Sequence, residues 1–416
     1  MIKILFLPAY FHPEHAASSY LGYNRYEKIA SEGMEMEIYC PTPTRGIAFD
    51  VRKQYKGKKE EYMYDGKLHV HRFSLYGEGK NPLLRAFRYF LQAIFHFYFG
   101  VFGKDAKKCN VMFITSTPPI QGAMGALVKK FRRIPMIYNL QDIFPDSLVG
   151  TGLAKKDGFL WKIGRTIENF TYRNADKIIV ISEDFKRNIM AKGVPEEKIV
   201  VIYNWVDEEA VKHVNREDNV LFERYGLDRE KFYITYSGNI GLTQNMDLLL
   251  EVAKELETEP DIQFVLIGEG AYKERVKEII AEKNIVNVTL LSFQPYEEIS
   301  HVFSLGDVGL VISKPGVGEN SVPSKTWSIL SASRPVLANF DENELKEIVD
   351  KHQCGIFTKT GDKEAFKQAI LNLYQNKDLC TKMGSNGRDF ILKNLTRAVG
   401  TQKYVDVIKS VEKGEE

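Results

Sequence analysis

The feature that most constrains this chain is an alternation of short apolar runs with longer amphipathic stretches, repeated in two series. Such alternation is typical of parallel β-sheets wrapped by helices, with ligands bound at the carboxyl ends of the strands. The sequence therefore predicts two doubly wound α/β domains with a cleft between them. The expected strands are 2–7, 36–40, 68–73, 111–115, 136–140, 177–181 and 199–202, and then 233–237, 263–267, 288–291, 308–312, 335–338 and 355–357.

A polar stretch at 208–228 separates the two series, just after Tyr203-N-W-V-Asp207. We place the domain boundary there, which gives an N-terminal domain at 1–205 and a C-terminal domain at 206–394. The segment 45–66 breaks the first series because it is rich in Lys, Glu and Tyr. We expect it to be a mobile insertion or an exposed hairpin.

Composition excludes several classes of protein. The formal net charge of +2 gives no reason to expect a nucleic-acid partner, and 44% hydrophobic content is that of a globular chain. Cys40, Cys109, Cys354 and Cys380 form no C-x-x-C pair, which favours a reducing, cytoplasmic compartment over a disulfide framework or a zinc site. Pro8 and Glu14 interrupt the apolar N-terminus, so we expect a buried first strand and no signal peptide.

One aromatic, apolar segment at 82–103 raises the question of membrane contact. Arg85, Arg88, Gln92 and His96 interrupt it, which argues against a spanning helix. Two interpretations remain open: a mostly buried helix of the first domain, or a helix that also lies at the lipid interface. In the second, segment 82–108 contacts the membrane while these basic side chains meet headgroups: Lys80, Arg85, Arg88, Lys104, Lys107 and Lys108.

Three strands of the second series run into turns that suit a nucleotide. Gly238 and Gly241, in S-G-N-I-G-L-T-Q, allow a tight turn before a helix whose first amides are able to bind an anion. The next strand runs into Gly268-Glu269-Gly270, and the third is followed by Phe293, a candidate for stacking on a base. Each feature alone is equally explained as an ordinary turn, a helix cap or a core aromatic.

A fourth strand end carries the strongest signal, G-E-N-S-V-P-S-K-T-W-S-I-L. Pro323 suits the first turn of a helix, and Ser321 or Ser324 is able to cap it. Lys325 adds a full positive charge where the helix dipole is already positive, which suits a diphosphate. The alternative is a capped structural helix with a solvated lysine.

The ordered set G-N-I-G, I-G-E-G, L-L-S-F-Q-P, D-V-G-L-V-I-S and P-S-K-T-W-S-I-L-S-A-S-R-P-V-L-A resembles family 4 glycosyltransferases of the GT-B fold. It is most similar to the N-acetyl-L-fucosamine transferase-like branch of bacterial surface-polysaccharide enzymes. The resemblance implies two facing Rossmann-like domains, with the last helix, about 395–416, returning to the first. It also implies a donor nucleotide sugar on the second domain, an acceptor on the first, retention of configuration and no obligatory metal or other cofactor.

The sequence departs from the family pattern at three positions. Asn239 and Gln244 stand where many members carry Arg and Lys beside the diphosphate. Ser328 stands where many carry the ribose-binding second Glu of Glu-x7-Glu, and Glu319 lies one residue from the first. We therefore expect Lys325 to compensate the donor's charge, and Glu319 to contact its sugar hydroxyls.

Candidate catalytic residues are Lys325 and Glu319 on the donor side and Glu14 and Asp142 on the acceptor side. Glu14 follows the first strand, and Asp142 lies in Q-D-I-F-P-D. The pattern H-P-E-H at 12–15 lacks the helical His pairing of H-E-x-x-H, so we expect no metal there. Glu14 and Asp142 are equally explained as residues that cap or brace a loop.

The resemblance implies a UDP-sugar donor, N-acetylated or deoxy, and a lipid-linked saccharide acceptor of O-antigen or capsule synthesis, at the inner face of the plasma membrane. Two alternatives stay open: a nucleotide-sugar epimerase of the same fold, and a non-catalytic scaffold. The three departures support the scaffold. A dehydrogenase is disfavoured because no G-x-G-x-x-G follows a strand.

Overall fold

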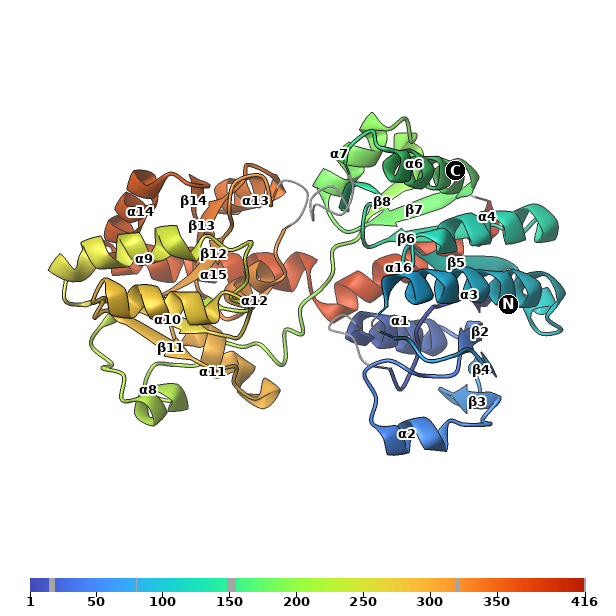
Figure 1. The fold of residues 1–416 in the computed structure, drawn as a ribbon, viewed down its shortest axis with the longest axis horizontal. Coiled ribbons are helices and arrows are strands. Elements are labelled where there is room, and N and C mark those ends of the chain that lie inside the picture. The colour runs from blue at the N-terminus through green and yellow to red at the C-terminus, as the bar shows by residue number, and fades with distance from the viewer. Residues whose placement is uncertain (15–18, 80, 148–154, 319–321, 415–416) are drawn as a thin grey trace. The chain divides into compact units, whose positions relative to one another are not determined.

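The computed structural model describes residues 1–14, 19–79, 81–147, 155–318 and 322–414. It divides into two compact units, 1–203 with 400–416 and 204–399, shown in Figure 1. Each unit is an open α/β sheet with helices on both faces, as predicted, and its strands were located within a few residues by the sequence pattern.

Unit 1 contains an eight-stranded sheet of order β3-β4-β2-β1-β5-β6-β7-β8. All its neighbouring strands are parallel except β3 and β4. Its elements are β1 (Lys3–Phe6), α1 (Ser19–Ser31), β2 (Glu35–Pro41), α2 (Phe49–Gln54), β3 (Glu60–Met63), β4 (Leu68–Phe73), α3 (Pro82–Phe102), β5 (Val111–Thr115), α4 (Ile120–Arg132), β6 (Met136–Leu140), α6 (Phe159–Asn174), β7 (Lys177–Val180), α7 (Glu183–Ala191), β8 (Ile199–Val201) and α16 (Arg397–Lys413).

Unit 2 contains a six-stranded, wholly parallel sheet of order β11-β10-β9-β12-β13-β14. Its elements are α8 (Val220–Tyr225), β9 (Phe232–Ser237), α9 (Met246–Glu255), β10 (Ile262–Ile267), α10 (Lys273–Glu282), β11 (Val288–Leu291), α11 (Ile299–Ser304), β12 (Val308–Ile312), α12 (Lys325–Ser331), β13 (Val336–Phe340), α13 (Glu344–His352), β14 (Gly355–Lys359), α14 (Lys363–Gln375) and α15 (Lys377–Asn394).

Side chains of β9 alternate between two apolar layers, which is why its sequence reads as a continuous hydrophobic run. Phe232, Ile234 and Tyr236 pack into one buried cluster, and Tyr233 packs into another on the opposite face of the sheet. Because successive strand residues point to opposite faces, both faces of a covered parallel sheet must be apolar.

The last helix, α16, belongs to unit 1 from Gly400 onward. Tyr404 is buried in unit 1, where its hydroxyl donates to Oδ1 of Asn139 over 3.1 Å. The guanidinium of Arg25 lies 5.2 Å from the centroid of the Tyr404 ring, and Lys409 pairs with Glu32 at 2.8 Å. The helix therefore contributes buried side chains to a sheet that the first 203 residues build.

The segment 45–66 contains two ordered elements in place of a loose insertion. Helix α2 lies within it, and β3 pairs antiparallel with β4, with Tyr62 opposite His69. The charged sequence E-E-Y-M hid this strand, because only alternate residues of β3 are half-buried.

Helix α3 differs from both interpretations of segment 82–103. Arg88, Gln92 and His96 are fully buried, so the expectation that Arg88 meets lipid headgroups is wrong. The Arg88 guanidinium instead donates to the carbonyl of Tyr76 over 3.0 Å. The helix is nevertheless far from buried, because eight of its large apolar side chains are exposed: Leu83, Leu84, Phe87, Phe90, Ile94, Phe95, Tyr98 and Phe102.

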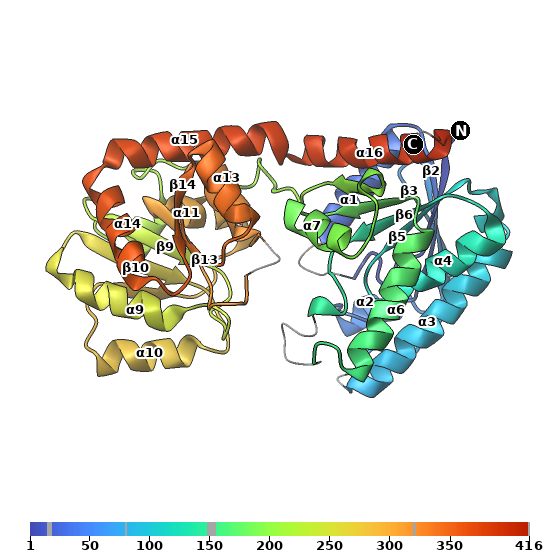
Figure 2. The same cartoon turned by 90° about the horizontal axis from the view of Figure 1, so that it is seen from above.

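The exposed apolar face continues onto two further helices. Helices α3, α4 and α6 lie side by side (Figure 2). Exposed apolar side chains on α4 and α6 are Leu127, Phe131, Phe159, Leu160 and Ile163. Among the helices that the structure describes, none is both long enough and apolar enough to cross a bilayer.

Candidate active site

The turns after β9 and β10 are held against each other by backbone hydrogen bonds at the carboxyl edge of the unit 2 sheet. The amide of Ile240 donates to the carbonyl of Glu269 over 2.9 Å, and the amide of Tyr272 donates to the carbonyl of Ile240 over 3.0 Å. A Cβ atom on Gly268 would lie 1.9 Å from the carbonyl oxygen of Gly238. No side chain fits between these backbones, which explains the glycine.

Lys325, the first residue of α12, reaches this pair of turns. Its Nζ lies 3.8 Å from the centroid of the Tyr236 ring, and a Cβ on Gly238 would meet that Nζ at 2.9 Å. The φ angle of +146° at Gly238 also favours glycine. Lys325 therefore lies directly against the first glycine turn, as expected for a residue that serves the same ligand.

The Lys325 ammonium has no ion-pair partner among the residues that the structure describes. Burial lowers its pKa from 10.5 to about 7, because the charged form has lost water without gaining a carboxylate. The face of an aromatic ring partly offsets that loss. A strongly perturbed lysine at the edge of a parallel sheet is a candidate anion-binding group.

Asn239, Gly241 and Gln244 shape the first turn. Oε1 of Gln244 accepts from the amide of Gly241 over 3.0 Å, and the Tyr236 hydroxyl donates to the carbonyl of Asn239 over 2.6 Å. These uncharged residues stand where relatives carry cations, so in this turn they fix backbone geometry and leave the positive charge to Lys325.

The head of α12 differs from expectation. The helix begins at Lys325, so Pro323 precedes its first turn, and the half-exposed Ser324 makes no capping bond. The amides of Thr326 and Trp327 donate to the carbonyls of Pro323 and Ser324 over 2.9 and 3.1 Å. Two of the amides expected to face a diphosphate are therefore already engaged. Ser328 is half-buried on this helix, and Glu319 and Ser321 lie outside the described residues.

Glu269 and Phe293 follow β10 and β11 on the same edge. The Glu269 carboxylate is 52% exposed and pairs with Lys273 at 2.7 Å, and this hydrogen bond lowers its pKa. Phe293 is 53% exposed, which suits a stacking partner better than a core residue. Both remain candidates for contact with the nucleoside.

Asp341 is a supporting residue that the sequence reading missed. Its carboxylate, almost fully buried after β13, accepts from the amides of Gly316 over 3.0 Å and Gly318 over 2.7 Å. Asn343 donates from Nδ2 to the carbonyl of Gly318 over 2.7 Å. Together they fix the loop that leads from β12 toward Lys325. The signal was the polar D-E-N after an apolar run, a common way to end a strand.

In unit 1, Glu14 is a buried bracing residue. Its Oε1 accepts from the amides of Thr44 and Arg45 over 2.7 and 2.8 Å, and its Oε2 accepts from the amide of Phe11 over 3.3 Å. Burial raises the pKa of Glu14, and the three amides oppose that shift. Both oxygens are occupied, which suits positioning of the 44–45 loop better than proton transfer or metal binding.

Asp142 has a different environment from Glu14. It lies exposed just beyond the carboxyl end of β6. A carboxylate there is available to a substrate hydroxyl without giving up a protein contact. Of the two acceptor-side candidates, Asp142 is the one whose side chain is free to touch a ligand.

A cavity of about 480 Å³ lies at the carboxyl ends of β2 and β4 in unit 1. Thr44, held by Glu14, forms part of its wall. Three basic side chains of the α2 region line it, Arg52, Lys53 and Lys56, together with the exposed ring of Phe49. The cavity combines positive charge with an apolar ring, which suits an anionic amphiphile.

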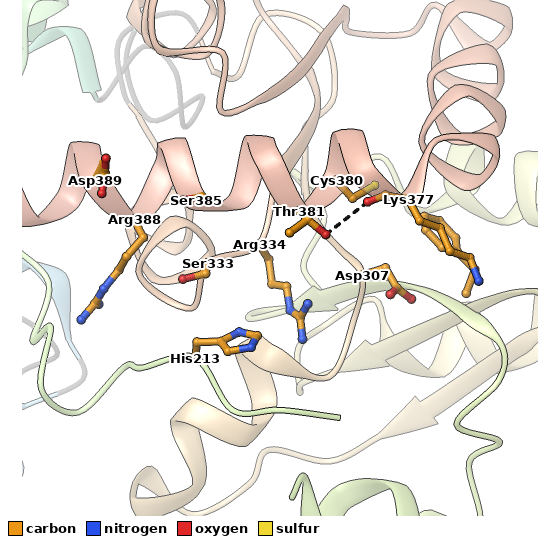
Figure 3. Close-up of a pocket in the computed structure, with 11 residues that line it drawn as sticks. His213, Asp307, Ser333, Arg334, Lys377, Cys380, Thr381, Ser385, Arg388 and Asp389 are labelled. Atoms are coloured by element: carbon orange, nitrogen blue, oxygen red, sulfur yellow. Dashed lines mark hydrogen bonds between the residues drawn. The ribbon is translucent and has the colours of Figure 1, made fainter. Parts of the chain in front are cut away.

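Another cavity, of about 570 Å³, lies in unit 2 at the opposite edge of the sheet from the glycine turns. Asp307 and Phe232, which line it, stand at the amino ends of β12 and β9. Figure 3 shows His213 and Arg334 together with the α15 residues Lys377, Thr381, Ser385, Arg388 and Asp389. Ligands of such sheets bind at the carboxyl ends of strands, so this cavity is not the donor site.

Two protein-family models match the chain. "Glycosyl transferase 4-like domain" matches residues 23–205, and "Glycosyl transferases group 1" matches residues 217–390. "Probable glycosyltransferase WbjE" of Pseudomonas aeruginosa is 26% identical over 305 residues, 73% of this chain and 75% of that protein. The colanic acid biosynthesis glycosyl transferase WcaI of Escherichia coli (strain K12) is 29% identical over 208 residues, 49% of this chain and about half (51%) of its own length.

Solved structures share the fold at low identity. Anabaena Alr3699/HepE in complex with UDP superposes with a TM-score of 0.73 at 15% identity, covering 98% of this chain and 100% of that chain. WaaG, described as a glycosyltransferase involved in lipopolysaccharide biosynthesis, superposes with a TM-score of 0.65 at 12% identity, covering 98% and 99%. The predicted GT-B fold is thereby confirmed. The chain belongs to the group 1 glycosyltransferases of family 4, and it is a glycosyltransferase with the GT-B fold.

Proposed function

We propose that the protein is a retaining glycosyltransferase that moves a sugar from a UDP-sugar to a lipid-linked saccharide in surface-polysaccharide synthesis. The observation that carries this proposal is the Lys325 ammonium, which lies without a described carboxylate partner against Gly238. Relatives and neighbours support it: HepE is described in complex with UDP and with UDP-glucose, and WcaI is named for colanic acid biosynthesis. The resemblance to the N-acetyl-L-fucosamine branch favours an N-acetylated or deoxy sugar.

Lys325 would act on the departing diphosphate. Breaking the bond between the sugar and the phosphate places negative charge on the phosphate oxygens as the sugar becomes oxocarbenium-like. A fixed ammonium stabilises that charge more than it stabilises the intact donor, so it lowers the barrier, by about 3 kcal/mol for one such group. A departing phosphate oxygen accepts the proton of the attacking hydroxyl, so no protein base is required, and no step uses a metal.

The remaining donor contacts follow from position. Gly238, Gly241 and Gly268 allow the diphosphate to approach the backbone, with Asn239 and Gln244 fixing the turn. Phe293 is proposed to stack on the uracil, and Glu269 and Ser328 to contact the ribose. Pro323 and Ser324 orient the start of α12. Glu319 and Ser321, outside the described residues, are proposed for the sugar hydroxyls and the phosphate.

For the acceptor, we propose the basic cavity of unit 1. A lipid-linked saccharide joined through phosphate presents negative charge beside an apolar chain, and Arg52, Lys53, Lys56 and Phe49 offer the complement. Asp142 is proposed to orient the acceptor hydroxyl, and Glu14 to hold the cavity wall through the amide of Thr44.

The apolar face of α3, α4 and α6 supports peripheral binding to the inner face of the plasma membrane. Phe87, Phe90 and Tyr98 are each more than half exposed on one helix, and exposed rings of this kind insert at the lipid interface. Exposed cations near the end of α3, at Lys104, Lys107 and Lys108, stand where anionic headgroups would attract them.

A donor screen tests the function. Nucleotide sugars are added singly and the melting temperature is measured, because a ligand of the native state raises it. We expect UDP and a UDP-sugar to raise it, and transfer to appear only with a lipid-linked acceptor. Interconversion of the sugar without acceptor would indicate an epimerase, and absence of any response to UDP would indicate a scaffold.

Vesicle sedimentation tests the membrane contact separately. Binding to anionic vesicles is compared for the wild type, for the triple variant Phe87→Ser, Phe90→Ser, Tyr98→Ser, and for Phe49→Ser as a control for one exposed ring elsewhere. We expect the triple variant alone to lose most binding. Equal binding by all three would show that this face does not dock on lipid.

A further inference from the structure

Four side chains of unit 1 that are separate from the candidate active site gather at one point. Glu37 on β2 is paired in register with His69 on β4, and His71 lies two residues further along β4. Residues two apart on a strand share a face of the sheet, so both imidazoles lie on the same side as Glu37. Asp105, just after α3, completes the group, and one ligand atom from each residue lies within 4.8 Å of all the others.

The distances are those of a compact cluster around Oε2 of Glu37. This oxygen lies 2.8 Å from Nε2 of His71 and 3.1 Å from Nδ1 of His69. Nε2 of His71 lies 4.0 Å from Oδ2 of Asp105. In a tetrahedral Zn²⁺ site with ligand bonds of about 2.1 Å, neighbouring ligand atoms are about 3.4 Å apart. Shifts of a few tenths of an ångström would bring the cluster to that spacing.

The other oxygen of each carboxylate is already held by a lysine. Nζ of Lys3 lies 2.7 Å from Oε1 of Glu37, and Nζ of Lys108 lies 2.7 Å from Oδ1 of Asp105. Each contact leaves one carboxylate oxygen turned toward the imidazoles. Outer hydrogen bonds that orient first ligands in this way are a regular feature of protein metal sites.

The two imidazole rings are also fixed. Tyr39 stacks on His71 with centroids 4.2 Å apart, and Tyr62 stacks on His69 at the same distance. Nε2 of His69 is buried without a hydrogen-bond partner and lies 3.9 Å from Oε2 of Glu60. A proton on this nitrogen, facing Glu60, leaves Nδ1 free to bind a cation.

Charge also favours a cation. The charged side chains in contact with the group are the carboxylates of Glu35, Glu37, Glu60 and Asp105 and the ammonium groups of Lys3 and Lys108. With neutral imidazoles, this set carries two net negative charges, which one divalent ion balances. A hydrogen-bonded network without metal would keep both this excess and the unpartnered Nε2.

We propose that His69, His71, Glu37 and Asp105 bind one divalent transition-metal ion, with Zn²⁺ as the expected occupant. Two imidazoles with carboxylates are borderline ligands that suit zinc better than Mg²⁺ or Ca²⁺. The ligands join β2 and β4 to the end of α3, so the ion acts as a structural link within unit 1. Lys325 belongs to unit 2, and the proposed transfer chemistry does not depend on this ion.

The test uses the full chain, stripped of metal with a chelator. Binding of ZnCl₂ is measured by calorimetry, and stabilisation by thermal unfolding. We expect one ion per chain and a rise in melting temperature of about 5 °C at a hundredfold excess over Kd. Co²⁺ bound in its place should give the visible absorption of a tetrahedral complex.

The double variant His69→Gln, His71→Gln should lose the bound ion and the shift. His352→Gln, a variant of a half-buried histidine in unit 2, is the matched control and should keep both. If the double variant fails to fold, the wild-type stoichiometry decides. Absence of a bound ion in the wild type, or equal Zn²⁺ shifts in the double variant and the control, would overturn the proposal.

Discussion

The ammonium of Lys325 lies 3.8 Å from the centroid of the Tyr236 ring, and the β9 strand that carries this ring runs directly into the turn at Gly238. The same tyrosine donates from its hydroxyl to the carbonyl of Asn239 over 2.6 Å. One side chain therefore supports both the cation and the turn that faces it. This arrangement links the strand, the glycine turn and α12 in one unit of structure.

Removal of the Lys325 charge should reduce turnover while the fold remains. We expect Lys325→Met to lower kcat by about 10²–10³-fold, the range measured for loss of one group that stabilises a departing or tetrahedral anion. Steady-state kinetics with the donor found in the screen provide the measurement. Lys346→Met, at an exposed lysine of α13 that pairs with Glu342, is the control and should change kcat little. Activity within threefold of wild type would rule out the role given to Lys325.

Donor binding should depend on pH through the same lysine. The pKa of Lys325 is lowered by burial from 10.5 to about 7, and a bound diphosphate favours the protonated form. Above about pH 7, UDP binding should therefore take up as much as one proton, and its affinity should fall by up to tenfold per pH unit. Calorimetry in buffers of different ionisation heat measures the uptake, which should be absent in Lys325→Met.

The stability of the free protein should follow the opposite sense. Between about pH 7 and 10.5 the unfolded chain keeps the Lys325 proton and the folded chain does not, so this lysine destabilises the fold less as pH rises. The stabilisation of Lys325→Met relative to wild type should be greatest below pH 7. Denaturant unfolding at several pH values measures it, and a stabilisation that grows with pH would contradict the assignment.

Alanine at Gly268 should disturb both the turn and the ligand site. The new Cβ would lie 1.9 Å from the carbonyl oxygen of Gly238, so one backbone must move. We expect a loss of about 1–3 kcal/mol in the free energy of unfolding, with weaker binding of UDP. Gly79→Ala is the matched control, because its Cβ would meet nothing within 4 Å and should change stability by less than about 0.5 kcal/mol. Equal unfolding curves for the two variants would mean that the turns are not tightly joined.

Asp341 should act as a positioning residue. Alanine at this position leaves the amides of Gly316 and Gly318 without their acceptor, at a cost of about 1–3 kcal/mol in stability. We expect kcat to fall as the loop before α12 loosens, with Asp341→Asn intermediate because one acceptor oxygen remains. Asp350→Ala, at an exposed position of α13, is the control. If Asp341→Ala lowers the melting temperature and leaves kcat and KM intact, its role is only structural.

Much of the donor site was predictable because glycine and lysine report local constraints. A turn that admits no side chain demands Gly238 or Gly268, and a lysine at a strand end is visible in one short window. The part played by Tyr236 was not predictable, since in sequence it is one more aromatic residue of a buried strand. Asp341 was also hidden, because the amides it accepts from lie 25 and 23 residues earlier in the chain.

The same reasoning explains the errors. Arg88 was assigned to lipid because charge in an apolar segment suggests exposure, but its partner, the carbonyl of Tyr76, lies on a separate segment. The metal cluster was invisible for a related reason: His69 and His71 are adjacent on one strand, while Glu37 and Asp105 reach them only after the sheet has formed.

The path of α16 limits how this protein is divided for study. A gene stopped after residue 203 encodes every strand of unit 1 but omits Tyr404, leaving Asn139 and Arg25 facing an unfilled groove. An independently folding half would require residues 400–416 to be grafted back through a linker. A simple C-terminal deletion would damage the first half of the chain more than the second.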